Sequence, residues 1–283
     1  MFCGLLCYGI VAGVLYGVYL YLQKLWMQKK LDRFTKEKCP KDKVILHGTK
    51  RGATVPSASP FVLKLETFLR MAKIDYEYDG DRKNTFGPKG KTPWITLNGE
   101  HIADSQLCIQ FLTKKFNKEI KNNYSEKEQA IASMTKVLLE DRVFWELVMW
   151  GFVWGGEGHQ AIQRVLKVPW YAVKLVGYHY KRVTWAQGIG RHTKEDIEAF
   201  THADMKTIAT ILGDNKFLLG DEPCLEDCAL FGFIAQLFWG FLSSSPYIKV
   251  VKEKYPNIEA YANRMKDRYF PDWDKLLANK KSS

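Results

Sequence analysis

The chain has 283 residues, of which 46% are hydrophobic and 14% aromatic, so it can bury a sizeable core and divide into two domains. Its 42 lysines and arginines exceed its 31 aspartates and glutamates, giving a formal charge of +11 that would suit nucleic-acid binding. Ten of the basic residues but only three acidic ones lie between Gln23 and Arg51, however, and the sequence contains no nucleic-acid-binding motif. The location of the charge therefore argues against nucleic acid as a partner.

The first segment of the chain predicts a membrane anchor. Phe2–Leu22 carries no charge, and as a helix it would span roughly 31 Å, close to the ~30 Å hydrocarbon core of a bilayer. The basic flank follows it, which predicts that the remaining chain faces the cytosol. A cleavable signal peptide is the alternative, but it would need a charged start, a shorter apolar run and a clear cleavage site. We therefore expect a single-pass anchor over residues 1–23 and a basic linker over 24–42, in a membrane that the sequence does not identify.

Three glycines recur every four residues in this anchor, at Gly9, Gly13 and Gly17. This spacing puts them on one helix face and lets two membrane helices approach closely, which predicts a homodimer through that face. Because glycine is common in membrane helices, the alternative is that the spacing has no role in association.

The six cysteines do not suggest a disulfide framework, because a cytosolic position keeps thiols reduced. Cys224 and Cys228 are four residues apart and could share a helix face that holds a soft metal. No histidine or third cysteine lies near them in the sequence, so we expect no metal site.

The part of the chain after the linker has the pattern of a mixed α/β domain. Val44–His47 predicts a first strand, Gly48–Ser57 a loop, and Pro60–Lys73 an amphipathic helix with apolar residues at helical spacing. Tyr76–Tyr78 predicts a second strand, and Asp79–Lys91 a polar connection.

A hairpin is expected after this connection. Asn98-Gly99 separates two β-prone runs, Trp94–Leu97 and His101–Ala103, and Asn-Gly between such runs is the strongest short hairpin signal. A helix from Ser105 to about Phe116 should follow.

Two dipeptides beside the hairpin predict a small polar pocket. Thr92-Pro93 precedes its first strand, and Asp104-Ser105 opens the helix after its second strand. An aspartate and a serine at a helix start bring together a carboxylate, a hydroxyl and free backbone N–H groups. A proline-braced edge beside such groups suits a peptide-like ligand that carries charges.

The second half of the chain reads as helical throughout. Lys127–Trp150 predicts one long helix and Gly151–Gly158 a glycine-rich break. Ile162–Tyr180 is rich in aromatic residues and divides into two helices, with Pro169 near the first turn of the second.

A capping box precedes the most apolar part of this half. Asp227 is placed to reach back three residues to Cys224, where a thiol is a poorer acceptor than the usual hydroxyl. The 15 residues Cys228–Leu242 carry no charge, which raises the alternative of a second membrane span. The run is shorter than the ~18 residues of a span, so we expect a central buried helix instead.

These features together resemble the glutathione transferase family, and more narrowly its metaxin-related group of failed axon connections proteins and nematode cadmium-responsive proteins. Four segments carry the resemblance: Pro56–Phe61, Lys64–Arg70, Gly90–Ile95 and Gly220–Gly232. The resemblance spans about residues 43–274. It implies an α/β thioredoxin-like N-terminal domain over 43–120 and an all-α C-terminal domain over 121–283, preceded by the transmembrane helix.

The resemblance also implies which residues would bind glutathione. In that family the residue before a cis-proline offers its backbone to the glutathione cysteine, which corresponds here to Thr92 before Pro93. An acidic residue followed by serine holds the γ-glutamyl end, which corresponds to Asp104 and Ser105, and Lys91 would meet a carboxylate. The alternative for Asp104-Ser105 is an ordinary helix N-cap pair.

Activity in this family depends on the group that meets the glutathione sulfur. Omega-class relatives have Cys-Pro-Phe where this chain has Ser59-Pro60-Phe61. The catalytic candidate is therefore the hydroxyl of Ser59, or of Ser57, which would hydrogen-bond the thiolate and lower its pKa. A serine cannot form the mixed disulfide of thiol–disulfide exchange, which disfavours a reductase. The alternative is that Ser59 is only a helix cap, with Pro60 at the first helical position.

Two functions fit this resemblance. The first is a membrane-anchored glutathione transferase-like protein in detoxification or cadmium and metal stress, using glutathione as cosubstrate with small electrophiles or metal-thiolate species. The second is a non-catalytic interaction protein at a membrane surface, with a metaxin-like or axonal development role. The missing catalytic cysteine or tyrosine favours the second function, whereas the Thr92-Pro93 and Asp104-Ser105 pairs favour the first.

Overall fold

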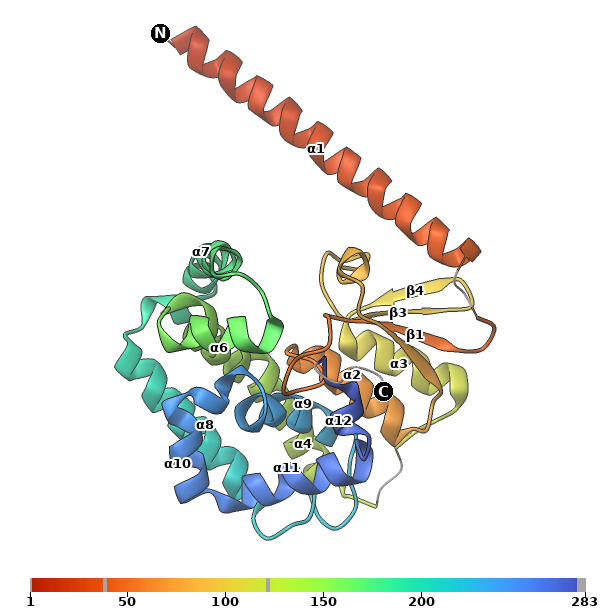
Figure 1. Cartoon of the computed structure of the whole chain (residues 1–283), viewed down its shortest axis with the longest axis vertical. Helices are drawn as coiled ribbons and strands as arrows, with labels where there is room; N and C mark the ends of the chain where they lie inside the picture. Colours follow the sequence, from red (N-terminus) through yellow and green to blue (C-terminus); the bar gives the residue numbers. More distant parts are fainter. Residues whose placement is uncertain (1, 38–39, 121–122, 279–283) are drawn as a thin grey trace.

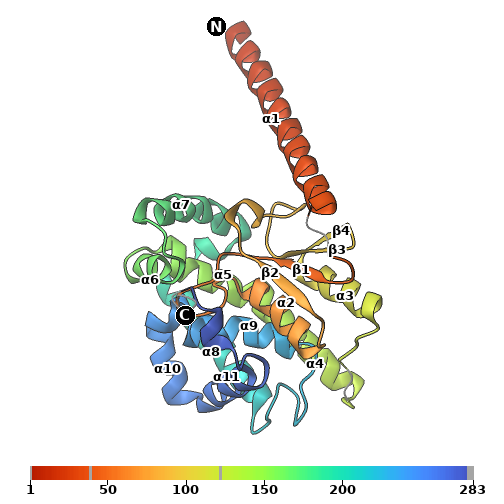
Figure 2. The same cartoon turned by 45° about the vertical axis from the view of Figure 1, so that its right-hand side comes forward.

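The computed structural model describes residues 2–37, 40–120 and 123–278, and of residues 2–10, 12, 36 and 37 it gives the backbone alone. It has three parts: a long N-terminal helix, a domain built on a four-stranded sheet, and a helical domain (Figure 1). The N-terminal helix α1 covers Phe2–Glu37 and projects away from the two packed domains, as Figure 2 also shows.

The sheet has the strand order β2-β1-β3-β4. Its strands are β1 Val44–His47, β2 Tyr76–Asp79, β3 Trp94–Leu97 and β4 Glu100–Ala103. β1 and β2 are parallel and joined through helix α2, whereas β3 pairs antiparallel with β1 and with β4. This arrangement confirms the expected thioredoxin-like domain.

Local sequence explains where the elements of this domain begin and turn. Helix α2, Pro60–Met71, starts after the N-cap Ser59, and helix α3, Ser105–Phe116, starts after the N-cap Asp104. The β3–β4 turn has φ angles of 50° at Asn98 and 85° at Gly99, a left-handed pair that Asn-Gly tolerates well.

The two faces of the sheet are covered differently. Alternate strand residues such as Leu46 and Ile95 pack against α2 and α3 and form one hydrophobic core. The opposite face carries Trp94, which is fully buried beneath Phe34 from the last turns of α1. The expected linker is therefore helical as far as Glu37, and its C-terminal turns are part of the α/β domain.

The helical domain surrounds a central buried helix. Its helices are α4 Glu126–Leu138, α5 Phe144–Val148, α6 Glu157–Leu166, α7 Trp170–Gln187, α8 Lys194–Leu212, α9 Asp227–Phe238, α10 Pro246–Lys254, α11 Pro256–Tyr269 and α12 Trp273–Leu276. Short 3-10 turns occupy Ile189–Arg191 and Phe241–Ser244 in this domain, and Arg82–Asn84 between β2 and β3 of the sheet domain. Pro169 caps α7, as expected for the second of two helices.

The expected helix Lys127–Trp150 is interrupted by two π-helical turns. These turns, Leu139–Val143 and Met149–Val153, flank the short helix α5. Helical structure therefore continues past Gly151, which sequence had placed in a loop. At this position an added Cβ would lie 2.9 Å from the Phe241 ring, so glycine here permits close packing rather than a turn.

Helix α9 occupies the centre of this domain. Its capping interaction is present as expected, because Asp227 Oδ2 accepts a 2.8 Å hydrogen bond from the backbone N–H of Cys224. Among the described residues, Asp227–Ser244 is the one stretch long and apolar enough to cross a membrane, yet 78% of it is buried inside the protein. It is thus the expected core helix. Because the side chains of residues 2–10 and 12 are outside the described part, the anchor stays a prediction.

Candidate functional site

The register of the sheet brings the two predicted dipeptides together. Trp94 pairs with His47 on one side and with Ala103 on the other, so the strand ends that carry both dipeptides meet at one edge. The backbone N–H of Asp104 donates to the carbonyl of Pro93 at 3.4 Å, which places the two dipeptides side by side. The Thr92-Pro93 peptide bond is cis, as the resemblance implied.

The acidic dipeptide is built into the start of α3. Asp104 has a φ of 89°, and its Oδ1 accepts hydrogen bonds from the backbone N–H groups of Gln106 at 2.9 Å and Leu107 at 3.1 Å. Ser105 is buried, whereas Lys91 is exposed beside Thr92. The N-cap role considered for Asp104 is therefore real, and its second oxygen is the one left to meet a ligand.

The two candidate serines have different surroundings. Ser57 is fully buried, and its Oγ accepts a hydrogen bond from the backbone N–H of Ser59 at 3.2 Å and lies 3.0 Å from Thr49 Oγ1. Ser59 is partly exposed and accepts a 3.4 Å hydrogen bond from the Val62 N–H at the start of α2. This geometry favours Ser59 over Ser57 as the hydroxyl that a ligand could reach.

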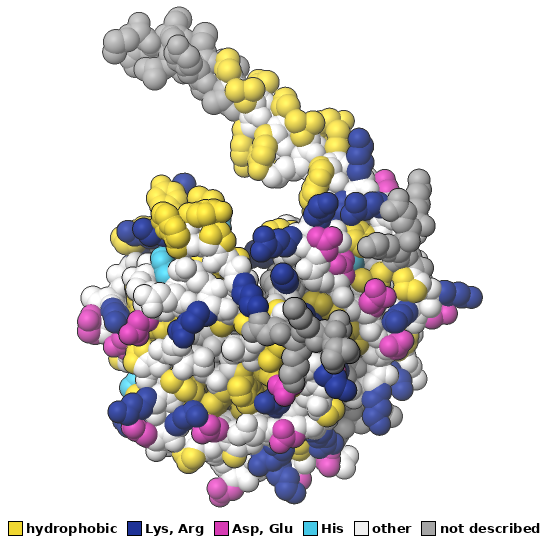
Figure 3. Space-filling model, in the orientation of Figure 1, with side chains coloured by type: hydrophobic (Ala, Val, Ile, Leu, Met, Phe, Trp, Pro, Cys, Tyr) yellow, Lys and Arg dark blue, Asp and Glu magenta, His cyan; other side chains and the backbone are white. Residues whose placement is uncertain are grey.

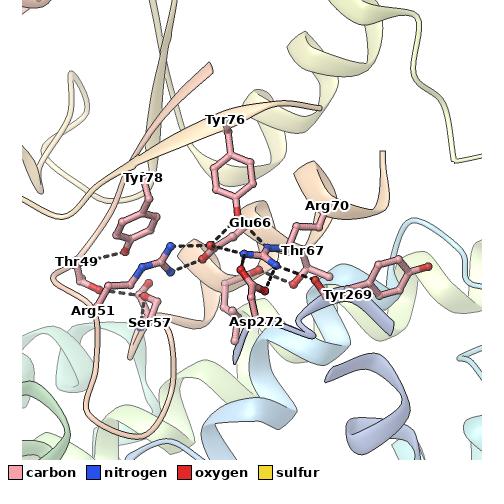
Figure 4. Close-up of polar contacts among 12 residues, drawn as sticks. Thr49, Arg51, Ser57, Glu66, Thr67, Arg70, Tyr76, Tyr78, Tyr269 and Asp272 are labelled. Atoms are coloured by element: carbon pink, nitrogen blue, oxygen red, sulfur yellow. Dashed lines mark hydrogen bonds and ion pairs between the residues drawn. The ribbon is translucent and has the colours of Figure 1, made fainter. Parts of the chain in front are cut away.

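A buried polar network fixes the loop that precedes Ser59 (Figure 4). Arg51 donates two hydrogen bonds, of 2.7 and 2.8 Å, to the carboxylate of the fully buried Glu66, and its guanidinium lies 3.5 Å from the ring centroid of Tyr78. The Tyr78 hydroxyl donates to the Thr49 carbonyl, and burial raises the tyrosine pKa, so this donor stays protonated. Bidentate arginine–carboxylate pairs are geometrically specific, so this pair holds the loop at Arg51 against α2.

The same network continues into the helical domain. Arg70 on α2 donates to both carboxylate oxygens of Asp272, at 2.6 and 3.0 Å, and to the Tyr76 hydroxyl at 2.8 Å (Figure 4). The hydrogen bonds from Arg70 lower the pKa of Asp272. The segment after α11 is thereby tied to the helix that starts at Ser59.

Sequence reasoning missed a buried lysine beside this site. Lys64 is 1% exposed, and its Nζ donates to Gln106 Oε1 at 2.9 Å and to Glu140 Oε1 at 2.6 Å. It thus links α2, the first turn of α3 and the helical domain. Its burial could have been predicted from its position four residues before Phe68, which puts it on the apolar face of the helix.

The sequence also gave no sign that two histidines would meet. His47 Nδ1 lies 2.8 Å from Asp79 Oδ2 and its Nε2 lies 3.0 Å from Thr96 Oγ1, which in turn lies 2.9 Å from His101 Nδ1. Burial lowers the pKa of His47, whose ring stacks on Trp94 at 3.6 Å. Within the described ranges no group of three or more potential metal ligands occurs.

Comparison with known protein families agrees with this geometry. Residues 60–153 match the glutathione S-transferase N-terminal domain, and residues 201–265 match the glutathione S-transferase C-terminal domain. The two ranges together cover more than half of the chain. The chain belongs to the glutathione S-transferase family.

Three relatives narrow this placement. Failed axon connections from Drosophila melanogaster is 31% identical over 256 residues, which are 83% of this chain but 60% of that protein. The isoprene-epoxide–glutathione S-transferase of Rhodococcus sp. (strain AD45) is 27% identical over 76% of this chain and 94% of its own. Metaxin-2 from Mus musculus is 22% identical over 75% of this chain and 83% of its own. The expected kinship with failed axon connections proteins and metaxins is thus confirmed.

A solved structure supports the fold. The glutathione S-transferase of Methylobacterium radiotolerans, crystallised in complex with glutathione sulfonate, superposes with a TM-score of 0.53 at 17% identity. The match covers 85% of this chain and 98% of that one. At this identity the likeness establishes the two-domain fold and leaves activity to be argued from the site.

Proposed function

We propose that this glutathione S-transferase family member binds glutathione at the sheet edge where α2 and α3 begin, and that its N-terminal helix holds it on a membrane with both domains in the cytosol. The observation that carries the binding proposal is the juxtaposition of the cis Thr92-Pro93 bond with Asp104-Ser105. The first dipeptide offers backbone groups to a peptide-like ligand. The second offers a carboxylate oxygen at a helix N-terminus, suited to an ammonium group.

Ser59 supplies the chemistry in this proposal. Its hydroxyl stands at the N-terminus of α2, where the helix dipole also favours a negative charge. A hydrogen bond to a charged group is worth about 1.5–3 kcal/mol, which would lower a thiol pKa of ~8.5 by roughly one to two units. Ser59 would therefore hold a thiolate ready to attack a small electrophile, while the bond from Val62 N–H keeps its oxygen oriented.

The proposed setting is detoxification or a response to cadmium and other metals. Glutathione supplies the nucleophilic sulfur, which reacts with electrophiles and also binds soft metals as a thiolate. The isoprene-epoxide–glutathione S-transferase relative supports the first kind of substrate. The uncharged segment Phe2–Leu22, which forms the first part of α1, supports the membrane location.

Calorimetric titration of glutathione into the full chain in mild detergent tests binding. We expect millimolar or tighter affinity that Ser105→Ala weakens at least tenfold. Ser125→Ala, which removes an N-cap serine from α4, is the matched control and should bind like the unsubstituted chain. No heat from the folded chain at several millimolar glutathione would overturn the proposal.

One observation favours a non-catalytic interaction role as the second candidate. The Asp104 carboxylate is already engaged with two backbone N–H groups, and the nearby Lys64 amine is held by Gln106 and Glu140. A pocket in which one oxygen of Asp104 and the amine of Lys64 already have partners within the protein suits a retained scaffold. Absence of glutathione binding together with intact membrane attachment would be the result that this second role predicts.

A further inference from the structure

Outside α1, exposed hydrophobic side chains gather on helix α7. In the described chain outside α1, ten large hydrophobic residues are exposed, and six of them lie on α7. They are Trp170, Tyr171, Leu175, Val176, Tyr178 and Trp185. Leu175 is 72% exposed and Tyr178 is 68% exposed, so these side chains face solvent and do not pack against the core. A contiguous apolar patch of this kind marks an interaction surface, whereas single exposed residues do not.

The opposite face of α7 holds the helix firmly against the domain. Val173 and Thr184 are buried, and an added Cβ at Gly177 would lie 2.4 Å from the Phe152 carbonyl oxygen. The helix backbone is therefore seated directly on the second π-helical turn. The outer face cannot rotate inward to bury its aromatic residues.

The outer face forms a continuous stripe. Its residues follow each other at spacings of four, three, four and three along the helix: Tyr171, Leu175, Tyr178, Arg182 and Trp185. Lys174 and Lys181 flank the stripe, with Lys174 Nζ 5.0 Å from the Trp170 ring centroid. The helix contains no acidic residue. Tryptophan and tyrosine mixed with lysine and arginine are typical of helices that lie in a bilayer interface.

Figures 1 and 2 show that α7 lies on the side of the molecule toward which α1 projects. In Figure 3 the hydrophobic patch over α7 and the hydrophobic side chains along α1 are seen at this same end of the molecule. A bilayer crossed by residues 2–22 would therefore lie above α7. The basic flank of α1 and the basic residues of α7 would both meet its cytosolic surface.

We propose that the outer face of α7 binds the surface of the same bilayer that holds α1. Trp170 and Trp185 lie at the level of the lipid headgroups, and Lys174, Lys181 and Arg182 meet anionic headgroups. The proposal rests on the membrane anchor of the proposed function. A second copy of α7 is the competing occupant, but pairing two helices that each carry three positive charges and no negative one brings like charges together.

Quenching of tryptophan fluorescence by brominated lipids tests this surface. The full chain is reconstituted in vesicles of phosphatidylcholine and phosphatidylserine, with bromine on the acyl chains near the headgroups. Exposed tryptophans at the interface are Trp26, Trp170 and Trp185, so Trp170→Phe/Trp185→Phe should remove about two-thirds of the quenching. The matched control, Trp239→Phe/Trp273→Phe, changes one partly buried and one buried tryptophan of the helical domain and should leave the quenching unchanged. Replacing Lys174, Lys181 and Arg182 by glutamine should reduce the difference between vesicles with and without phosphatidylserine, because the basic flank of α1 is then the part left to meet the anionic headgroups.

Carbonate extraction separates this proposal from the anchor. If the chain resists extraction but the quenching does not change in Trp170→Phe/Trp185→Phe, the anchor holds and binding of α7 to lipid is overturned, whether or not the chain dimerises. If carbonate releases the unsubstituted chain but Trp170→Phe/Trp185→Phe lowers the lipid quenching as expected, α7 binds lipid and the anchor is overturned. If carbonate releases the chain and no lipid quenching is seen, both are overturned.

Discussion

The Ser59 hydroxyl serves both the helix and the proposed chemistry, because its oxygen accepts from Val62 N–H while its O–H can donate to a thiolate. Ser59→Ala should lower the free energy of unfolding by about 1 kcal/mol through loss of the N-cap. It should also raise the pKa of the bound glutathione thiol by about one to two units, because the donor is gone. The pH titration of the far-ultraviolet thiolate absorbance measures this shift. Ser125→Ala should show the stability loss alone, and an equal thiol pKa in both variants would contradict the role of Ser59.

Glu146 on α5 gives a residue-scale prediction about pH. It is 3% exposed, and burial together with the neighbouring Asp204 raises its pKa to about 8. The folded state therefore binds a proton that the unfolded chain releases above about pH 4.5, so this group's contribution to stability falls as pH rises toward 8. Glu146→Gln mimics the protonated acid. It should match the unsubstituted chain near pH 4.5 and exceed it at pH 8 by about 1–3 kcal/mol. Urea unfolding at both pH values is the measurement, with exposed Glu253→Gln as control, and equal stability at pH 8 would contradict the assignment.

At the scale of elements, the sequence predicted those boundaries that local chemistry sets. The starts of α2 and α3 follow from Ser59 and Asp104, and the β3–β4 turn follows from Asn98-Gly99. The π-helical turns around α5 carry no comparable local signal, because a π turn forms where tertiary packing requires an extra residue in the helix.

Contacts between distant elements set the parts of the site that sequence could not predict. The dipeptides Thr92-Pro93 and Asp104-Ser105 could be picked out by their local chemistry, and the register of the sheet places them side by side. Their roles toward glutathione, and the candidacy of Ser59, came from the family resemblance. The ion pair between Lys64 and Glu140 joins residues 76 positions apart. This ion pair forms only when the two domains dock, and the spacing of apolar residues in α2 does not predict how they dock.

The C-terminal end of α1 packs on the sheet domain, although the sequence predicted a basic linker over residues 24–42. Phe34 is 2% exposed and packs edge-on against His47 and Trp94, with ring centroids 4.7 and 5.6 Å apart. Truncating a buried phenylalanine costs about 3–5 kcal/mol. Phe34→Ala should therefore detach this end and speed tryptic cleavage after Lys30 and Arg33 by at least about 100-fold.

The exposed Phe86 provides the control for this experiment. Its side chain is 57% exposed, while its carbonyl accepts a 2.6 Å hydrogen bond from Lys30 that Phe86→Ala leaves in place. This variant should be cleaved at the rate of the unsubstituted chain. Equal rates for all three proteins would mean that the end of α1 is not held by Phe34.

Over the whole molecule, one helix crossing connects the stability of the two domains to the site. An added Cβ at Gly232 on α9 would lie 2.6 Å from the carbonyl oxygen of Pro60 and 2.9 Å from the backbone nitrogen of Lys64, so only glycine lets α9 approach the start of α2 this closely. Gly232→Ala should push α2 away from α9 and lower the free energy of unfolding by about 1–3 kcal/mol, as overpacking of a core does. Because Pro60 follows Ser59 directly, the same shift should displace the Ser59 hydroxyl and weaken glutathione binding more than the stability loss alone would.

Urea unfolding and glutathione titration of Gly232→Ala together check this coupling. Gly17→Ala is the matched control, because an added Cβ at Gly17 meets nothing within 4 Å and its glycine lies in α1, outside both domains. That variant should leave the unfolding midpoint of the domains and the affinity for glutathione unchanged. If Gly232→Ala lowers stability but binds glutathione normally, the crossing sustains the fold without positioning the site. If Gly232→Ala loses both stability and glutathione binding, the close approach of α9 to α2 holds the first turn of α2 in place. The helical domain then acts on the site by positioning the Pro60 backbone of α2, and not by offering a side chain to the ligand.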